Sequence, residues 1–169
     1  MDKRESHDIA RFRNRLENAK GYGEIWEIVK DCAEFHMQKR RGGMMLFLDD
    51  LPIQLGAYHS LGTNNIVLNR RLVQIVEATI KSKPVVNALI YNLLLHEYLH
   101  ALGEFSEVDV RQLVYEISRK CFGEDHVTTA IAKKSPWALL KDIPPQALNL
   151  RSRVVEIVRD FEKTDKYIV

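Results

Sequence analysis

The chain has 169 residues, of which 46% are hydrophobic and 28% are charged, and its formal net charge is +2 at pH 7. This length and composition predict one domain, residues 1–169, with a single core. A charge so close to zero provides no field that would favour nucleic acid or an anionic membrane surface as a partner.

The sequence lacks the apolar segments that export or membrane insertion would need. Residues 1–20 are charged throughout, and the longest apolar run, 88–95, is far below the roughly 20 residues that cross a bilayer. Cys32 and Cys121 have no paired spacing for zinc or redox work, so we expect two small apolar side chains in a reducing compartment; a disulfide or a regulatory thiol is the alternative. We therefore expect a soluble cytoplasmic protein without membrane insertion.

Two helices are expected at the start of the chain, over residues 8–20 and 24–40. The apolar side chains of the second recur every three or four residues, at Ile25, Ile28, Val29, Cys32 and Phe35. The pair Gly42-Gly43 is expected to end it.

Short runs of β type follow, over residues 44–49, 54–60 and 65–69, separated by turn residues. They predict a small three-stranded sheet. Residues 71–81 return to helical spacing, and Ser82-Lys83-Pro84 has the composition of a cap with proline in the first turn of another helix.

That next helix, from Pro84 to about Leu102, is apolar on nearly every side, as expected of a helix that runs through the core. Gly103 is expected to end it. Ser106 and Asp109 have the spacing of a capping box at the start of the following helix. A short helix to Lys133 and a final amphipathic helix from about 148 to 161 complete the expected elements. The fold class is therefore α+β, with a core at about 40–122 and terminal helical extensions, 1–39 and 123–169.

The core helix carries the sequence H-E-Y-L-H at residues 96–100. Two histidines four residues apart lie on one helix face, so His96 and His100 can bind a single metal ion. Glu97 lies about 100° round the helix and can reach water beside the metal without occupying a coordination position. This pattern predicts hydrolysis in which Glu97 takes a proton from water and passes it to the leaving amine.

Catalytic zinc usually has three protein ligands, so a third residue is needed. The turn at Gly103 brings the next helix back toward the histidines, and Glu107 is the best-placed acid there. The alternatives are Glu104, Asp109, Asp125 and His126. Arg111, one turn after Glu107, is either an outer partner of that glutamate or a surface charge.

The motif H-E-Y-L-H followed by S-E-V-D-V-R at 106–111 resembles the gluzincin branch of the zincin metallopeptidases, and its short spacing is similar to that of the soluble minigluzincins of archaea. G-A-Y-H-S-L-G at 56–62 and I-V-L-N-R-R-L-V at 66–73 resemble the membrane peptidases related to HtpX and the CaaX prenyl protease. The resemblance implies a minimal zincin fold, a Zn²⁺ cofactor and Glu107 as the ligand on a "glutamate helix".

The resemblance also implies that a peptide or protein substrate pairs with a sheet edge at Gly56, Ala57 and Tyr58, as an unpaired edge would permit. It implies a latent enzyme, held inactive by a terminal extension over the cleft. Tyr58, His59 and His126 are candidates to stabilise the oxyanion. The alternative functions are a non-catalytic zincin-fold module that binds metal or a protein partner, and a helical interaction protein without metal.

Overall fold

The computed structural model describes residues 2–143 and 151–162, and within them the chain has the expected α+β class. The six α-helices are α1 (Lys3–Glu17), α2 (Tyr22–Met37), α3 (Arg70–Ile80), α4 (Lys83–Ala101), α5 (Glu107–Phe122) and α6 (Val127–Lys134), and a 3₁₀ turn, η1, covers Pro136–Leu140. The strands are β1 (Met45–Asp49), β2 (Ala57–His59), β3 (Asn65–Asn69) and β4 (Glu156–Ile157).

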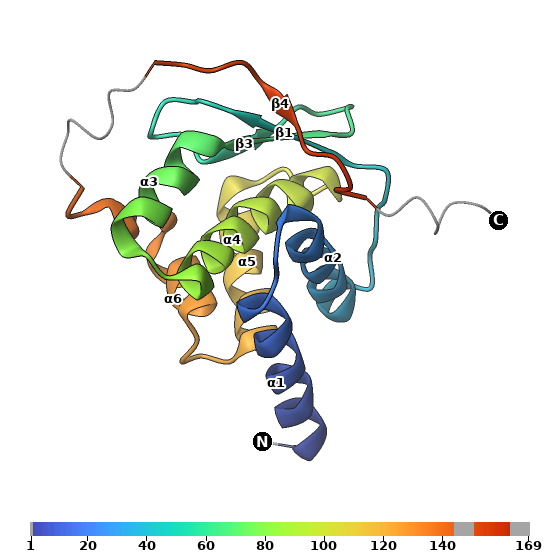
Figure 1. The fold of residues 1–169 in the computed structure, drawn as a ribbon. Helices are drawn as coiled ribbons and strands as arrows, with labels where there is room; N and C mark the ends of the chain where they lie inside the picture. Colours follow the sequence, from blue (N-terminus) through green and yellow to red (C-terminus); the bar gives the residue numbers. More distant parts are fainter. Residues whose placement is uncertain (1, 144–150, 163–169) are drawn as a thin grey trace.

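The strands form one mixed sheet in the order β2-β3-β1-β4. Strand β1 is parallel to β3, whereas β2 pairs antiparallel with β3 and β4 pairs antiparallel with β1. In the described chain β2 is therefore one edge of the sheet, and β4 covers the other side of β1 (Figure 1).

Helix α4 runs through the core beneath this sheet (Figure 1). Its side chains from Ala88 to Leu95 are all buried, which explains why its sequence is apolar on every side. Alternate residues of the strands face the helices, and Leu46, Leu48, Ile66 and Leu68 are at most 6% exposed. Burying both α4 and this face of the sheet makes one core.

The expected helix at 148–161 is wrong over the described residues 151–161. Residues 148–150 lie outside the described residues, and β4 follows instead. The backbone N–H of Val158 donates to Leu46 O at 2.9 Å, so this segment adds a strand to the edge of β1. The apolar residues of R-V-V-E-I-V fit a strand as well as a helix, and the unpaired edge of β1 decides between them.

Other boundaries differ from the expectation by a few residues. Helix α2 ends at Met37 rather than at residue 40, because Gln38 takes the left-handed C-cap conformation with φ of 57°. Strand β2 begins at Ala57 rather than at residue 54, because the Asn69 side chain donates to the carbonyls of Leu51, Pro52 and Leu55 and holds that loop out of the sheet.

Two expectations about single features are met. Cys32 and Cys121 are buried and form no disulfide. Among the described residues no helix is long and apolar enough to span a bilayer.

Candidate metal centre

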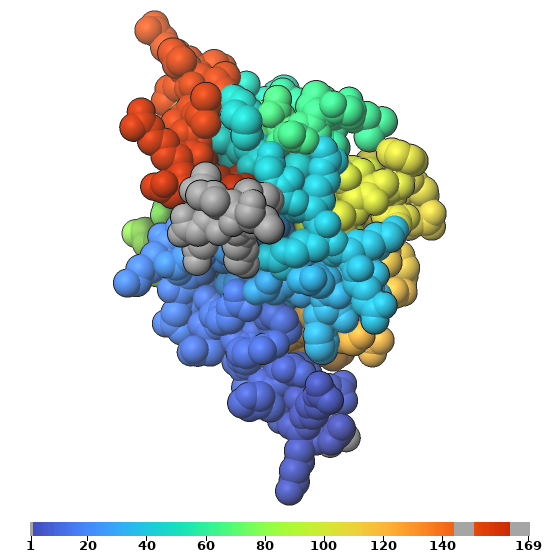
Figure 2. All heavy atoms as spheres, turned by 90° about the vertical axis from the view of Figure 1, so that its right-hand side faces the viewer, coloured from blue at the N-terminus to red at the C-terminus, as the bar shows by residue number. Residues whose placement is uncertain are grey.

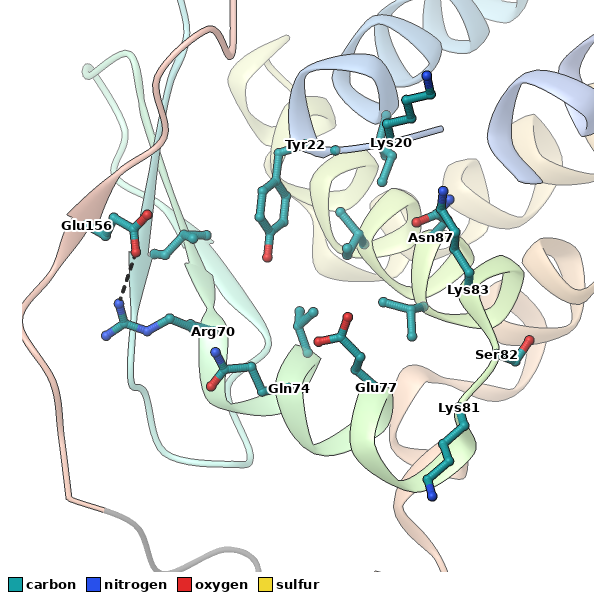
Figure 3. A pocket seen from close by; sticks show the side chains of 16 residues that line it. Lys20, Tyr22, Arg70, Gln74, Glu77, Lys81, Ser82, Lys83, Asn87 and Glu156 are labelled. Atoms are coloured by element: carbon teal, nitrogen blue, oxygen red, sulfur yellow. Dashed lines mark ion pairs between the residues drawn. The ribbon is translucent and has the colours of Figure 1, made fainter. Parts of the chain in front are cut away.

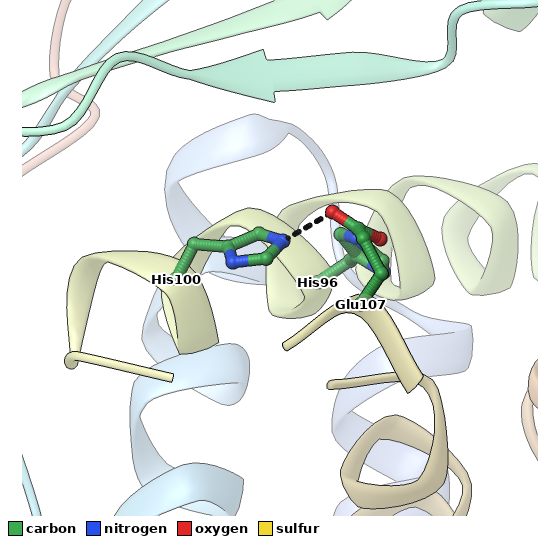
Figure 4. Close-up of side chains that lie close together, drawn as sticks. All are labelled: His96, His100 and Glu107. Atoms are coloured by element: carbon green, nitrogen blue, oxygen red, sulfur yellow. Dashed lines mark hydrogen bonds and ion pairs between the residues drawn. The ribbon is translucent and has the colours of Figure 1, made fainter. Parts of the chain in front are cut away.

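Helices α4 and α5 bring His96, His100 and Glu107 together (Figure 4). The His96 Nε2 atom lies 3.1 Å from one Glu107 carboxylate oxygen, and the His100 Nε2 atom lies 2.9 Å from the other. One ligand atom from each residue lies within 4.8 Å of the other two. The histidine pair and the acid expected from the sequence therefore face one point.

The reversal between the two helices depends on local sequence. Gly103 has φ of +103°, a backbone conformation that side chains with a Cβ rarely adopt. Ser106 caps α5 by accepting a hydrogen bond from the Asp109 N–H at 3.3 Å, the first half of the expected capping box. Glu107 is thus the first residue of α5 and projects back toward α4.

Both ring nitrogens of His100 face hydrogen-bond acceptors. Its Nδ1 lies 2.7 Å from the backbone carbonyl oxygen of Glu104, and its Nε2 lies against the Glu107 carboxylate. A neutral imidazole has one N–H and cannot donate to both acceptors. When Nδ1–H donates to the carbonyl, the Nε2 lone pair faces the carboxylate, and a cation held between the two would make this contact favourable. This arrangement is that of metal-binding histidines, whose other ring nitrogen is usually held by a carbonyl or carboxylate.

The donor set fits a zinc ion. Zinc takes imidazole nitrogen and carboxylate oxygen at about 2.0–2.2 Å, so tetrahedral ligand atoms lie roughly 3.4 Å apart. The nitrogen-to-oxygen separations here are 2.9 and 3.1 Å. An outward movement of a few tenths of an ångström would make the space, and Glu107, whose side chain is 60% exposed, is free to make it.

Glu97 lies beside this group and is 7% exposed. Burial raises the pKa of its carboxyl to about 7, and the negative charge of Glu107 acts in the same direction. His100 and a hydrogen bond from the backbone N–H of His59 oppose the rise. Burial also lowers the pKa of His96, and the charges of His100 and Arg111 add to this, whereas Glu107 opposes it. Neutral imidazole is the form that binds metal.

The chain entering strand β2 packs against α4, since a Cβ at Gly56 would lie 2.6 Å from the side chain of Leu93, one helical turn before Glu97. The Asn69 N–H donates to Gly56 O at 2.8 Å, so Gly56 and, by alternation, Tyr58 point their backbone groups toward β3. Ala57 and His59 therefore direct their N–H and C=O groups to the open edge. Of the three residues expected to pair with a substrate, Ala57 has its backbone groups at the open edge, whereas those of Gly56 and Tyr58 face β3.

The other candidate ligands lie elsewhere or are engaged. The Glu104 carboxylate faces Lys39 at 3.4 Å, Asp125 pairs with Arg13, and the Nε2 atom of His126 lies 3.1 Å from Glu17. These contacts place His126 and Asp125 beside α1, away from the three-residue group. The oxyanion role considered for His126 loses its geometric support, and the His59 side chain is held by Nδ1 against Asn65 O at 2.9 Å.

Comparisons with protein-family models, with curated proteins and with solved structures find no match to this chain.

The site is open among the described residues. The His96 side chain is 25% exposed and that of Glu107 is 60% exposed. Strand β4 lies on β1, at the edge of the sheet opposite β2, and Figure 2 shows the C-terminal segment in red against the strands and the N-terminal helices. Helix α1 contacts the far ends of α4 and α5, where Asn87 donates to Leu16 O and Arg13 to Phe122 O. The described parts of α1 and of the C-terminal segment thus do not supply the expected shield.

A separate pocket of about 520 Å³ lies at the other end of α4 (Figure 3). Tyr22 and Glu77 point into it, and Arg70 pairs with Glu156 at its border at 3.5 Å. Burial and the charges of Glu77 and Glu156 raise the pKa of Tyr22 to about 12. The pocket contains none of His96, His100 and Glu107, so it is distinct from the candidate metal centre.

Proposed function

We propose that the protein is a zinc-dependent peptidase of the minigluzincin type, with a minimal zincin fold. The convergence of His96, His100 and Glu107 on one point carries this proposal. In support, the buried carboxylate of Glu97 follows His96 directly on α4, and the open edge strand β2 packs against this helix.

Each residue has a defined part. His96 Nε2, His100 Nε2 and the Glu107 carboxylate would hold the ion, and the Glu104 carbonyl fixes the His100 ring by its bond to Nδ1. A bound zinc ion supplies acidification of water and polarisation of a carbonyl group. Glu97 accepts a proton at its carboxylate and returns it to the leaving amine. The Ala57 backbone pairs with an extended peptide and holds it over Glu97.

Zinc content tests the ligand set. The protein purified without chelator is expected to carry one zinc ion per chain, measured by elemental mass spectrometry, and His96→Ala is expected to lose it. Glu104→Gln is the matched control, because its backbone bond to His100 persists and its side chain lies outside the group. Absence of zinc in the wild-type protein would contradict the proposal and favour an interaction protein without metal.

Hydrolysis tests the catalytic part. Glu97→Gln is expected to keep zinc and to lower kcat by roughly 10²- to 10⁴-fold, the usual contribution of a general base. The measurement is cleavage of quenched-fluorescent peptides by zinc-loaded protein. Zinc binding without hydrolysis by the wild-type chain would instead identify a non-catalytic module.

A further inference from the structure

The outer face of the sheet, which is the face turned away from α4, carries a row of apolar side chains. The cross-strand register pairs Tyr58 with Val67, Val67 with Phe47, and Phe47 with Ile157. The row therefore runs Tyr58, Val67, Phe47, Ile157 across the whole sheet. Residues on either side of it, such as Leu46 and Leu68, face the core instead.

Tyr58 stands at the open end of this row. It lies on the edge strand β2 and is 38% exposed, and within the described chain its only cross-strand partner is Val67. Ile157 stands at the other end of the row and is 55% exposed. Both end residues are exposed on the same face, but Tyr58 lies on β2, the edge strand that packs against α4, the helix of His96 and His100.

We propose that a peptide which pairs with β2 extends this row by one residue, and that the Tyr58 ring selects a large apolar side chain at that position. The inference rests on the proposed function, because it takes β2 as the substrate edge. Side chains of a strand alternate between faces, so the substrate residue opposite Tyr58 lies on the outer face. The residues before and after it, opposite Ala57 and His59, face α4 and the metal centre.

The pairing type brings this contact close. Ala57 directs its backbone N–H and C=O to the open edge, so an antiparallel peptide would form a hydrogen-bonded pair with it. The residue opposite Tyr58 then belongs to a non-hydrogen-bonded pair, in which side chains approach most closely. Aromatic–aromatic and aromatic–β-branched pairs are the favourable combinations across strands. The predicted substrates are extended peptides with an aromatic or β-branched residue opposite Tyr58.

The test measures binding separately from catalysis. Fluorescence anisotropy is recorded for zinc-loaded Glu97→Gln protein with labelled heptapeptides of alanine that carry one central guest: Tyr, Val, Lys or Glu. We expect Tyr and Val peptides to bind roughly two- to fivefold more tightly than Lys, the range for a single cross-strand pair. Adding Tyr58→Lys is expected to abolish this preference and to favour the Glu guest over the Lys guest.

Two control variants locate the effect. Ile157→Lys changes the same face at the far end of the row and is expected to leave the order of guests unchanged. Phe105, which is 70% exposed near the start of α5, offers the competing apolar contact on the other side of the site. Three outcomes would overturn the inference. The tighter binding of the Tyr and Val guests persists in Tyr58→Lys, it changes in Phe105→Lys, or no variant shows it. Failure of the proposed function is distinguishable, because it appears as wild-type protein without zinc or without hydrolysis.

Discussion

Asp50→Asn is expected to destabilise the fold without affecting zinc. The Asp50 carboxylate has no exposed surface and accepts hydrogen bonds from two arginines. Arg70 donates from Nε and Nη2 at 3.2 and 3.3 Å, and Arg153 donates from its backbone N–H, Nε and Nη2 at 2.7, 3.0 and 2.9 Å. These bonds attach the C-terminal segment to the end of β1.

The magnitude follows from what the variant leaves behind. Removing one partner of a buried ion pair costs about 3–5 kcal/mol when the other charge stays buried. The Arg70 side chain is 9% exposed and would stay buried, but that of Arg153 is 47% exposed and can turn to water. We therefore expect a loss of about 2–4 kcal/mol in the free energy of unfolding at pH 7, somewhat less than the full cost of an unpaired buried charge. With an m-value of about 2 kcal/mol per molar urea, the midpoint falls by roughly 1–2 M.

The pH dependence has a defined sign. Hydrogen bonds from Arg153 and Arg70 hold the pKa of Asp50 well below its usual range, although burial opposes them. A depressed folded-state pKa gives stability that is complete above the unfolded pKa of about 3.9 and is lost as pH falls. The difference in the free energy of unfolding between wild type and Asp50→Asn should therefore decrease by about 1 kcal/mol as the pH falls from 6 to 3.

Urea unfolding followed by circular dichroism measures both quantities, and hydrogen exchange at Val158 N–H reports release of the segment alone. Glu156→Gln is the control, because this carboxylate pairs with Arg70 at 3.5 Å but is 63% exposed. It should change stability by less than about 1 kcal/mol. A difference below about 0.5 kcal/mol for Asp50→Asn, or one that widens toward pH 3, would refute the reasoning.

Further predictions concern the metal and the C-terminal segment. Glu107→Gln should weaken zinc binding at least about 100-fold in a chelator competition, which is more than the loss of a residue that only hydrogen-bonds to a ligand would cause. Glu104→Gln should leave zinc binding unchanged. Adding zinc at 100 times its Kd should raise wild-type stability by about 2.7 kcal/mol in thermal unfolding and leave His96→Ala unchanged. Phe161→Ala should cost about 3–5 kcal/mol, because this ring is 3% exposed and stacks on Trp26 at 4.7 Å; a loss under 1 kcal/mol would contradict that packing. Ending the chain after residue 150 should lower stability without raising hydrolysis per folded molecule, and a rate increase would restore the expectation of latency.

The central part of the fold was predictable because its signals are local. The all-apolar pattern of α4, the turn at Gly103 and the cap at Ser106 each act within a few residues, and together they place Glu107 beside the H-E-Y-L-H helix. The same is true of β1 and β3, whose expected ranges differ from the observed strands by at most one residue. The proximity of His96, His100 and Glu107 was therefore predictable from the sequence.

The C-terminal segment was not predictable because its conformation depends on partners far away in the sequence. The apolar spacing of this segment fits a helix and a strand equally well, at Val154, Val155, Ile157 and Val158. No local feature of the sequence indicates that Arg153 forms an ion pair with Asp50. Gly23 gives a similar example. A Cβ there would lie 2.6 Å from Asp160 O, so the glycine allows the segment to pass over α2, a contact that spacing alone does not reveal.

The two edges of the sheet are treated differently, and this difference supports the proposed function. An open strand edge invites unwanted pairing, and proteins usually cover it. Here the segment that begins at residue 151 pairs with β1 through β4, and the hydrogen bond from Arg153 N–H to the Asp50 carboxylate holds the segment in place. Strand β2 remains the open edge of the described sheet. Strand β2 packs against α4, the helix that carries His96, Glu97 and His100. An open edge beside this candidate metal centre is expected if a peptide must pair there, whereas a helical interaction module gives no reason for it.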